Sequence, residues 1–357
     1  MTRSNAIKHS LSTAAAAGPR QRRRRSLALT GALVVLAGVS VGAAPRDAAA
    51  AQTQTMVYVA DLIGSTVTPI DPATGNTPGQ PIPVGALPDG IAVTPNGRTA
   101  YVTSINTISS GLVTPIDLAT NTPGPPIRVG SEPGGIAITP DGHTAYVATS
   151  GDGTVTPIGL SAGRPLTGNR PGPGIHVGGA PGAVAITPNG ATAYVADLAD
   201  DTVIPINVAT NTPGLAIPVG GSPNALAIAP DGATAYVATD NGLVTPINLA
   251  TNTAGTPIAV GGEPAGIAIT PNGTTAYVTD FADDTVTPIN LATDATGAPI
   301  HVGTEPEAIA ITPDGNTAYV GNDDDGTVTP IDLATNTPGA PIVTGGDPAA
   351  IAIAGRA

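Results

Sequence analysis

Acidic side chains beside prolines are the first candidates for chemistry in this chain. All four glutamates and two of the aspartates lie beside a proline that stands three residues before an I-A-[IV] segment: Asp89, Glu132, Glu263, Glu305, Glu307 and Asp347. Carboxylates at one repeated place in a fold can bind a cation or act as an acid–base pair. We therefore take these six residues as the candidate ligand-binding set.

Runs of aspartate form a second candidate set: Asp200 and Asp201, Asp283 and Asp284, and Asp323, Asp324 and Asp325. Carboxylate oxygens suit Ca²⁺, which is the one cofactor that the sequence suggests. No D-x-D-x-D-G loop with a distal glutamate is present, and exposed aspartates also keep proteins soluble. A calcium site and a solvated surface both remain open.

The sequence offers few residues suited to catalysis. The chain has no cysteine, and residues 51–357 contain only three histidines, His143, His176 and His301. None lies in the segments that carry the candidate acids, so neither a Ser-His-Asp arrangement nor a histidine-rich metal site is supported. We predict no catalytic residue and lean towards a non-enzymatic protein. The alternative is a hydrolase or lyase that uses paired carboxylates.

The elements that position the candidate residues belong to a sequence repeat. All seven tyrosines share one motif, at Tyr58, Tyr101, Tyr146, Tyr194, Tyr236, Tyr277 and Tyr319. Each repeat holds four short β signals, I-A-I, T-A-Y-V, T-V-T-P-I-D and P-I-x-V-G, joined by T-P-[DN]-G and T-N-T-P-G turns. Four short strands per repeat of about 40 residues are typical of a propeller blade. The sequence predicts an all-β, seven-bladed propeller with four-stranded antiparallel blades over residues 51–357.

The two ends of the repeat region favour a closed ring. The first repeat starts at its second strand, residues 56–59, and the last repeat ends with a first strand, residues 351–353. The C-terminal strand is therefore expected to complete the N-terminal blade, which protects both strand edges.

One local conflict concerns a proline in every third strand: Pro69, Pro115, Pro157, Pro205, Pro246, Pro288 and Pro330. Proline cannot donate to a β ladder. Either its nitrogen faces a gap beside a short fourth strand, or the third strand bulges there.

Strand direction assigns the connections to two faces. Those from fourth to first strand and from second to third strand share one face, here named the acidic face because it carries both candidate sets. The remaining turns form the turn face. No Lys, Arg or His falls in the acidic-face connections, so we expect this face to bind cations or a cationic partner. A long loop at residues 104–111 and an insertion at residues 161–174 set the second and third blades apart.

The motifs AYVAD, TVTPIDLATNTPG, PIxVG and PxGIAITPDG resemble those of the YVTN-repeat family of β-propellers, which includes surface-layer-associated proteins. The likeness covers residues 56–353. It implies an extracellular or periplasmic seven-bladed propeller, usually without assigned catalysis, and a structural role in a surface layer as a further option.

Residues 1–50 have a different composition. A basic cluster at residues 20–25 precedes an apolar run at residues 27–43 and an alanine-rich cleavage site at residues 48–50. These are the three parts of a secretory signal peptide. Arg24 and Arg25 fit a twin-arginine signal, but Sec export is equally open, and an uncleaved anchor is the alternative. We expect a secreted or cell-surface protein with no membrane span after cleavage.

Charge limits the partners. Residues 51–357 contain five arginines and no lysine against 25 of the 26 acidic residues, a formal charge of −20. Nucleic-acid binding is excluded, because a phosphate backbone requires a basic surface. We expect a monomer whose partner is a protein, a glycan or a cell-envelope component.

Overall fold

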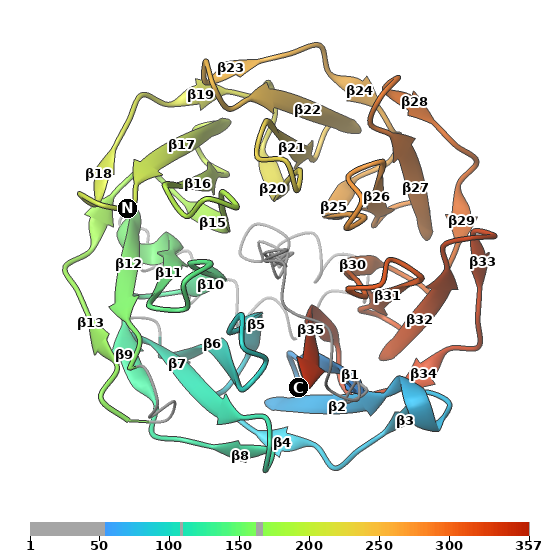
Figure 1. Ribbon diagram of the computed structural model, residues 1–357, viewed down its shortest axis with the longest axis horizontal. Coiled ribbons are helices and arrows are strands. Elements are labelled where there is room, and N and C mark those ends of the chain that lie inside the picture. Colours follow the sequence, from blue (N-terminus) through green and yellow to red (C-terminus); the bar gives the residue numbers. More distant parts are fainter. Residues whose placement is uncertain (1–53, 108–109, 162–166, 357) are drawn as a thin grey trace, which may run out of the picture.

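The computed structural model describes residues 54–107, 110–161 and 167–356, so the predicted signal peptide lies outside the described residues. The described chain forms seven sheets around one axis (Figure 1). Pairing is antiparallel in every sheet. The seven-bladed all-β propeller is therefore confirmed. The described residues include no helix long and apolar enough to cross a bilayer.

The innermost strands surround the axis: β5 (Pro88–Val93), β10 (Pro133–Ile138), β15 (Pro181–Ile186), β20 (Pro223–Ile228), β25 (Pro264–Ile269), β30 (Pro306–Ile311) and β35 (Pro348–Arg356). The second strands are β1 (Gln54–Asp61), β6 (Thr99–Thr107), β11 (Thr144–Thr149), β16 (Thr192–Asp197), β21 (Thr234–Thr239), β26 (Thr275–Asp280) and β31 (Thr317–Asn322). The third strands are β2 (Thr66–Asp71), β7 (Ser110–Asp117), β12 (Thr154–Gly159), β17 (Thr202–Asn207), β22 (Leu243–Asn248), β27 (Thr285–Asn290) and β32 (Thr327–Asp332).

Each outermost strand is split into two short pieces. The pairs are β3 (Thr77–Pro78) and β4 (Ile82–Pro83), β8 (Thr122–Pro123) and β9 (Ile127–Val129), β13 (Arg170–Pro171) and β14 (Ile175–His176), β18 (Thr212–Pro213) and β19 (Ile217–Pro218), β23 (Thr253–Ala254) and β24 (Ile258–Ala259), β28 (Ala295–Thr296) and β29 (Ile300–His301), and β33 (Thr337–Pro338) and β34 (Ile342–Val343). Two 3-10 turns, η1 (Pro72–Thr74) and η2 (Ser150–Asp152), lie in connections.

The ends of the chain close the ring as the sequence predicts. β35 pairs with β1 along the whole of β1, from Gln54 opposite Arg356 to Asp61 opposite Pro348. The last strand is thus the innermost strand of the first blade. Every blade thus has its innermost strand, and the edge of β1 that would otherwise be exposed is paired.

The proline in each third strand is explained by the split fourth strand. In the third blade, β11 and β12 pair without a register shift, so β12 has no bulge. The Gly172 N–H donates to the Pro157 carbonyl at 2.7 Å from the gap between β13 and β14. A residue's nitrogen and carbonyl point to the same side of a strand, so the proline nitrogen faces that gap and no ladder bond is lost.

The expected loop at residues 104–111 is wrong. β6 and β7 continue as a hairpin as far as Thr107 opposite Ser110. Ile105 and Thr107 favour an extended strand, and the pairing gains two residue pairs, Ile105 with Gly111 and Thr107 with Ser110, with a register shift between them. Of the insertion in the third blade, residues 162–166 lie outside the described residues.

The core consists of layers between blades. One layer combines Tyr146 and Val155 of the third blade with Val184, Val195 and Ile206 of the fourth. Both faces of each sheet are buried in this way, which explains why the strands are apolar on both faces.

A hydrogen bond from tyrosine to asparagine joins six of the seven pairs of neighbouring blades on the turn face. Each tyrosine hydroxyl donates to an asparagine in the turn of the next blade: Tyr58 to Asn121 (3.2 Å), Tyr101 to Asn169 (3.4 Å), Tyr146 to Asn211 (2.6 Å), Tyr194 to Asn252 (2.7 Å), Tyr277 to Asn336 (2.8 Å) and Tyr319 to Asn76 (2.8 Å). The last of these bonds crosses the point of ring closure. Where Tyr236 meets the sixth blade, Asp294 stands in the asparagine position. Burial raises the pKa of Tyr236, and the charge of Asp294 raises it further.

We expect Asp294→Asn to stabilise the protein by about 0.5–1 kcal/mol, because it supplies an uncharged acceptor for Tyr236. The backbone φ of 57° at Asp294 suits asparagine equally well. Urea unfolding at pH 7 measures the change. The matched control, Asn252→Asp, should lose a similar amount, and no loss there would show that the charge is irrelevant.

Candidate functional site

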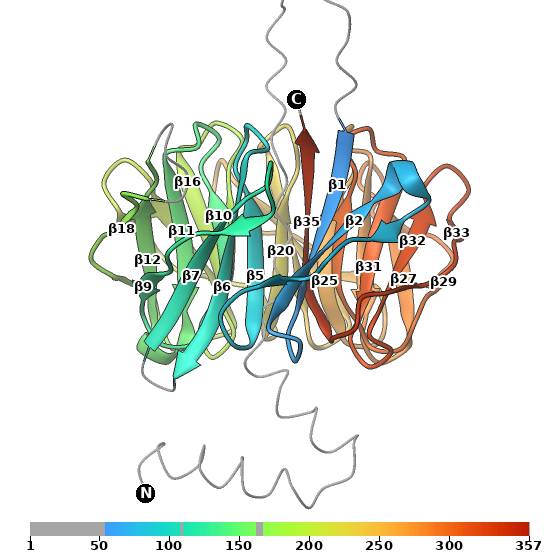
Figure 2. The same cartoon turned by 90° about the horizontal axis from the view of Figure 1, so that it is seen from below.

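The acidic face gathers most of the carboxylates, as predicted. Eighteen of the 25 acidic residues in residues 51–357 lie in its connections or at the strand ends beside them. Figure 2 shows these connections along the lower edge of the picture, opposite the end where β35 finishes. Among the described residues, no Lys, Arg or His lies in these connections. The connections of this face therefore carry charge of a single sign, and the nearest arginine, Arg128, belongs to the outermost strand β9.

The histidines lie away from the channel. His143 is in a turn on the opposite face, 3.3 Å from the Asp141 carboxylate. His176 and His301 pair with Thr154 and Thr285, so they occupy outermost strands at the end nearer the acidic face. Three strands separate them from the axis, so neither can serve a site there.

The residue after each blade proline forms a ring at the start of the innermost strands, here named the channel ring: Asp89, Gly134, Gly182, Asn224, Ala265, Glu307 and Ala349. Four members are Gly or Ala. The three polar members are buried, with 2% of Asp89, 5% of Asn224 and 7% of Glu307 exposed. Sequence reasoning missed Asn224, although the repeat alignment would have revealed it as a departure from Gly or Ala.

Asp89 is the least solvated acid of the ring. Its Oδ1 is buried without a hydrogen-bond partner among the described residues. Burial raises its pKa to about 8. A Cβ on Gly134 would lie 3.5 Å from Asp89 Oδ2, so the carboxyl extends over a neighbour that has no side chain.

The strand below Asp89 is held by Thr103. The Gly90 N–H donates to Thr103 Oγ1 at 2.8 Å, and the Thr103 hydroxyl donates to the Gly134 carbonyl at 2.7 Å. A Cβ at Gly90 would lie 2.5 Å from the Gly134 carbonyl oxygen, so only glycine fits here. This bridge fixes Asp89 against the third blade.

The other polar members of the ring are also anchored. The Asn224 amide donates through Nδ2 to the Pro264 carbonyl at 2.9 Å, which leaves Oδ1 as its acceptor. The Thr279 hydroxyl donates to the Glu307 carbonyl at 3.1 Å. Both bonds join neighbouring blades: the first holds the Asn224 side chain, and the second holds the backbone of Glu307.

The remaining proline-adjacent acids surround the ring. Glu132, Glu263, Glu305 and Asp347 precede their prolines and are half-buried. Glu132 and Glu305 adopt left-handed backbone conformations, with φ of 50° and 55°. The candidate ligand-binding set therefore divides into two positions, with Asp89 and Glu307 in the channel ring and the other four on its rim.

The aspartate runs hydrogen-bond to neighbouring connections of the same face. Asp200 Oδ2 accepts from the Gly179 N–H (3.3 Å), Asp284 Oδ1 from the Glu305 N–H (2.9 Å) and Asp325 Oδ2 from the Thr304 N–H (2.7 Å). Asp201 and Asp284 have φ of 54° and 58°, a conformation that aspartate tolerates better than most residues.

The structure does not bring these aspartates together around a single point. Asp283 and Asp324 are exposed, whereas Asp323 is half-buried. Among the described residues, no three His, Cys, Asp or Glu side chains are placed to hold one metal ion. Calcium binding by these runs stays a prediction.

The last residue of the second strand is buried in the loops of the same face. Asp61, Asp197 and Asp280 are at most 3% exposed. Asp197 Oδ1 accepts from the Ala180 N–H at 2.9 Å, and the Thr68 hydroxyl donates to Asp61 Oδ2 at 2.6 Å. Burial raises the pKa of Asp61 to about 6. These acids are structural caps of the loops.

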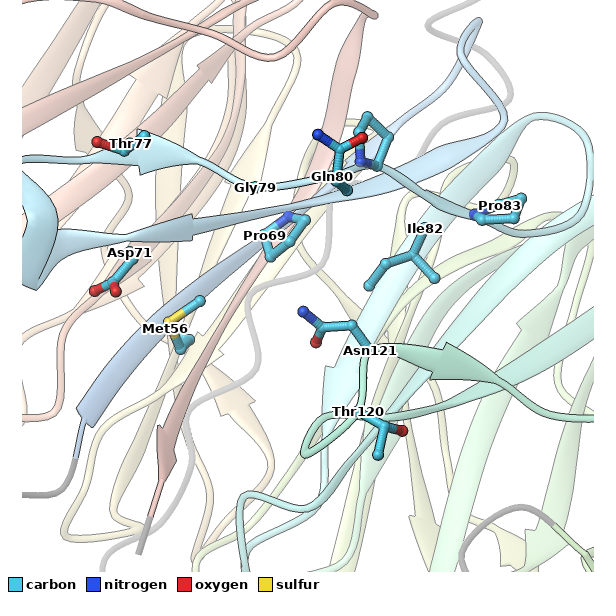
Figure 3. A pocket seen from close by; sticks show the side chains of 11 residues that line it. Met56, Pro69, Asp71, Thr77, Gly79, Gln80, Ile82, Pro83, Thr120 and Asn121 are labelled. Carbon is cyan, nitrogen blue, oxygen red and sulfur yellow. The ribbon is translucent and has the colours of Figure 1, made fainter.

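An open groove of about 440 Å³ lies at the outer edge of the first two blades, between β4 and the Thr120–Asn121 turn (Figure 3). Asp71 is its only acidic residue. A similar groove lies at the same place between the fifth and sixth blades. It recurs with the blade geometry and gathers no converging polar groups, so it is not the candidate site.

Comparisons with known proteins support the fold. No protein-family model matches the sequence, and no curated protein matches it. Among solved structures, a putative 6-phosphogluconolactonase from Bacteroides fragilis is 17% identical with a TM-score of 0.69, covering 86% of this chain and 99% of its own. Hydrazine synthase from Kuenenia stuttgartiensis is 22% identical with a TM-score of 0.66, covering 74% and 88%. A functionally unknown protein from Desulfotomaculum acetoxidans is 17% identical with a TM-score of 0.67, covering 85% and 99%. The likeness is one of fold.

Proposed function

We propose that this protein is an exported binding module whose acidic face captures a cationic ligand or partner. The observation that supports this most strongly is the separation of charge: eighteen acidic residues lie in the connections of that face or at the strand ends beside them, and those connections carry no basic side chain among the described residues. A surface of one sign concentrates counter-charged ligands and speeds their association. The repeat motifs support membership of the YVTN-repeat family, and the leader sequence supports export.

The alternative is a propeller hydrolase or lyase. The fold likeness to the putative 6-phosphogluconolactonase supports it. A phosphorylated substrate would, however, meet carboxylates on the acidic face, and the described residues there include no Arg or Lys to bind a phosphate. The same charge that favours a cationic ligand therefore opposes this substrate, and we give binding the preference.

The proposal predicts salt-dependent binding of cations to the full chain. We expect spermine binding by calorimetry to weaken roughly tenfold or more between 20 and 200 mM NaCl, because salt screens exposed charges. The triple variant Glu132→Gln, Glu263→Gln, Glu305→Gln should bind more weakly than wild type. The matched control removes three charges from the turn face, Asp117→Asn, Asp231→Asn, Asp332→Asn, and should bind as wild type does. Equal loss in both variants would show that net charge alone acts, and the proposal would fail.

A further inference from the structure

One sector of the acidic face carries no charge, where the first blade meets the second. It consists of Leu62 and Ile63 in the β1–β2 connection, Ala86 and Leu87 in the β4–β5 connection, and Ile105 near the end of β6, and is here named the apolar sector. Ile63 is 69% exposed and Leu87 is 42% exposed, so the sector holds two of the four exposed large apolar side chains of the described chain. Exposed apolar side chains that lie together mark interaction surfaces, whereas single ones are common on any protein.

Backbone hydrogen bonds hold the three connections of the apolar sector side by side. The Val84 N–H donates to the Ser65 carbonyl at 3.0 Å, and the Ile105 N–H donates to the Leu87 carbonyl at 3.4 Å. The β4–β5 connection therefore starts beside the loop of the first blade and ends beside the hairpin of the second. Figure 2 shows the β1–β2 hairpin, the start of β5 and the β6–β7 hairpin next to one another along the lower edge.

Both exposed residues occupy positions where other blades carry acids. The position of Ile63 is filled by Asp324 in the seventh blade. The residue before the blade proline is Leu87 in the second blade and acidic in four others: Glu132, Glu263, Glu305 and Asp347. Leu87 also has a left-handed backbone, with φ of 50°, which costs a bulky apolar residue more than an aspartate or asparagine. Large apolar side chains at two positions that the repeat can fill with acids indicate a contact outside the chain.

Acidic residues border the apolar sector on both sides. The Leu62 N–H donates to the Asp347 carbonyl at 2.7 Å, so this acid lies beside the loop of the first blade. On the other side, the Gly111 N–H of the second blade donates to the Gly130 carbonyl at 2.8 Å, and Glu132 follows in the same connection. A centre without charge and a charged border are typical of protein–protein interfaces.

The other large apolar residues in the second-to-third-strand connections do not extend this sector. Leu198 and Phe281 lie in the fourth and sixth blades and are half-buried. Each is followed by an alanine and then by two aspartates. The combination of exposed apolar side chains and neighbouring connections without charge therefore distinguishes the junction of the first two blades.

The charge of the border selects the partner. An anionic protein or an anionic lipid surface would meet the carboxylates of this face. A second copy that docked through the same face would bring acid against acid, because residues 51–357 contain five basic and 25 acidic residues. A small cation has no apolar group to cover Ile63 and Leu87. A polypeptide segment that combines apolar side chains with lysine or arginine fits both parts of the surface.

We propose that the apolar sector anchors a basic, apolar segment of a partner protein, whose aliphatic side chains cover Ile63 and Leu87. The lysines or arginines of that segment lie over the bordering acids Asp347 and Glu132. This docking site rests on the proposed function, because it names the partner of the acidic face. Burial of the two aliphatic side chains supplies most of the affinity, while the acids orient the segment and speed its association.

Calorimetry on the full chain tests the docking site with a short synthetic helical peptide that has leucines on one side and lysines on the other. Ile63→Asp and Leu87→Glu install residues that the repeat itself uses at these positions, as in Asp324 and Glu132, so the double variant is expected to fold. We expect it to bind the peptide roughly 10- to 100-fold more weakly than wild type, because the apolar contact is lost. Spermine, which has no apolar face, should bind the double variant at least as tightly as wild type, because the variant has more negative charge.

The matched control is Leu215→Glu, which replaces an exposed apolar residue between β18 and β19 at the outer edge of the fourth blade. This variant should bind the peptide within about twofold of wild type. Two control peptides, with the leucines replaced by serine or the lysines by glutamine, should each bind wild type more weakly than the original peptide. Thermal melts of each variant verify that it is folded.

Four results would overturn the docking site. Equal binding of the peptide to wild type and to the double variant would show that charge alone captures it, and the proposed function would stand. Phosphatidylcholine vesicles that retain wild type but not the double variant would assign the apolar sector to a lipid surface. A wild-type dimer that dissociates in the double variant would assign it to a second copy. Tighter peptide binding after all arginines of residues 20–25 are changed to serine would assign it to the chain's own leader. Absence of binding of both the peptide and spermine to wild type would refute this site and the proposed function together.

Discussion

Removal of residues 348–357 is expected to leave the chain unfolded at 25 °C. This segment contains β35, whose pairing with β1 completes the first blade. Its residues Ala350, Ile351 and Ala352 are at most 3% exposed and belong to core layers on both sides of that blade. Without it, the ring opens and the apolar faces of neighbouring blades meet water, which costs far more than the roughly 5–15 kcal/mol that stabilises a typical domain.

Far-ultraviolet circular dichroism and urea unfolding measure this loss. A synthetic peptide of residues 348–356 added to the shortened chain should restore folding, which separates the missing strand from a general defect. Ile351→Ala is a milder variant, expected to cost about 2–5 kcal/mol through the cavity that it creates. A shortened chain that unfolds cooperatively at the wild-type urea concentration would contradict ring closure as the source of stability.

The second large effect is a dependence of stability on pH through Asp89. Its pKa is about 8 in the folded chain and 3.8 when solvated, so the folded state retains a proton that the unfolded state releases. This contribution to stability is complete below pH 4 and is lost as the pH rises to 8. Asparagine stays neutral throughout. We expect Asp89→Asn to match wild type near pH 4 and to exceed it by up to about 5 kcal/mol at pH 8.

Urea unfolding at pH 4, 6 and 8 checks this prediction. Asp141 is the matched control of opposite sign, because hydrogen bonds from Thr139 and the His143 N–H lower its pKa. Asp141→Asn should therefore become less stable than wild type as the pH rises above 4. A constant difference between Asp89→Asn and wild type across the pH range would show that Asp89 is ionised in the folded protein.

The fold was predictable because one pattern recurs seven times and each copy carries its own turn signals. The two incomplete end repeats predicted ring closure, which the pairing of β1 with β35 confirms. The sequence could not decide how the proline in each third strand is accommodated, since a gap in the fourth strand and a bulge in the third strand are compatible with the same residues. The hydrogen bond from the Gly172 N–H to the Pro157 carbonyl shows that the fourth strand has a gap beside the proline.

The sequence predicted which face of the propeller carries the candidate residues, but not how each of them is buried there. Sequence placed Asp89 and Glu132 in one set because both adjoin a proline, yet one is buried in the channel ring and the other lies half-buried on the rim. The two positions are two residues apart, one on each side of the proline, and Glu132 lies before its strand in a left-handed conformation with φ of 50°. The alternation of side chains within a strand therefore does not relate them, and the bulge that follows each blade proline shifts the register as well. Burial of that kind depends on neighbouring blades and cannot be read from a single repeat.

The interrupted outermost strands also affect whether copies of this protein can pair with one another at high concentration. Chains built from near-identical blades are prone to exchange strands with one another, since any blade could pair with a foreign edge. Here each outward edge is interrupted after two or three residues, with prolines such as Pro78, Pro83 and Pro218 in the pieces themselves. An incoming strand finds no continuous row of donors and acceptors to follow. Copies of this protein can therefore lie close together without exchanging strands.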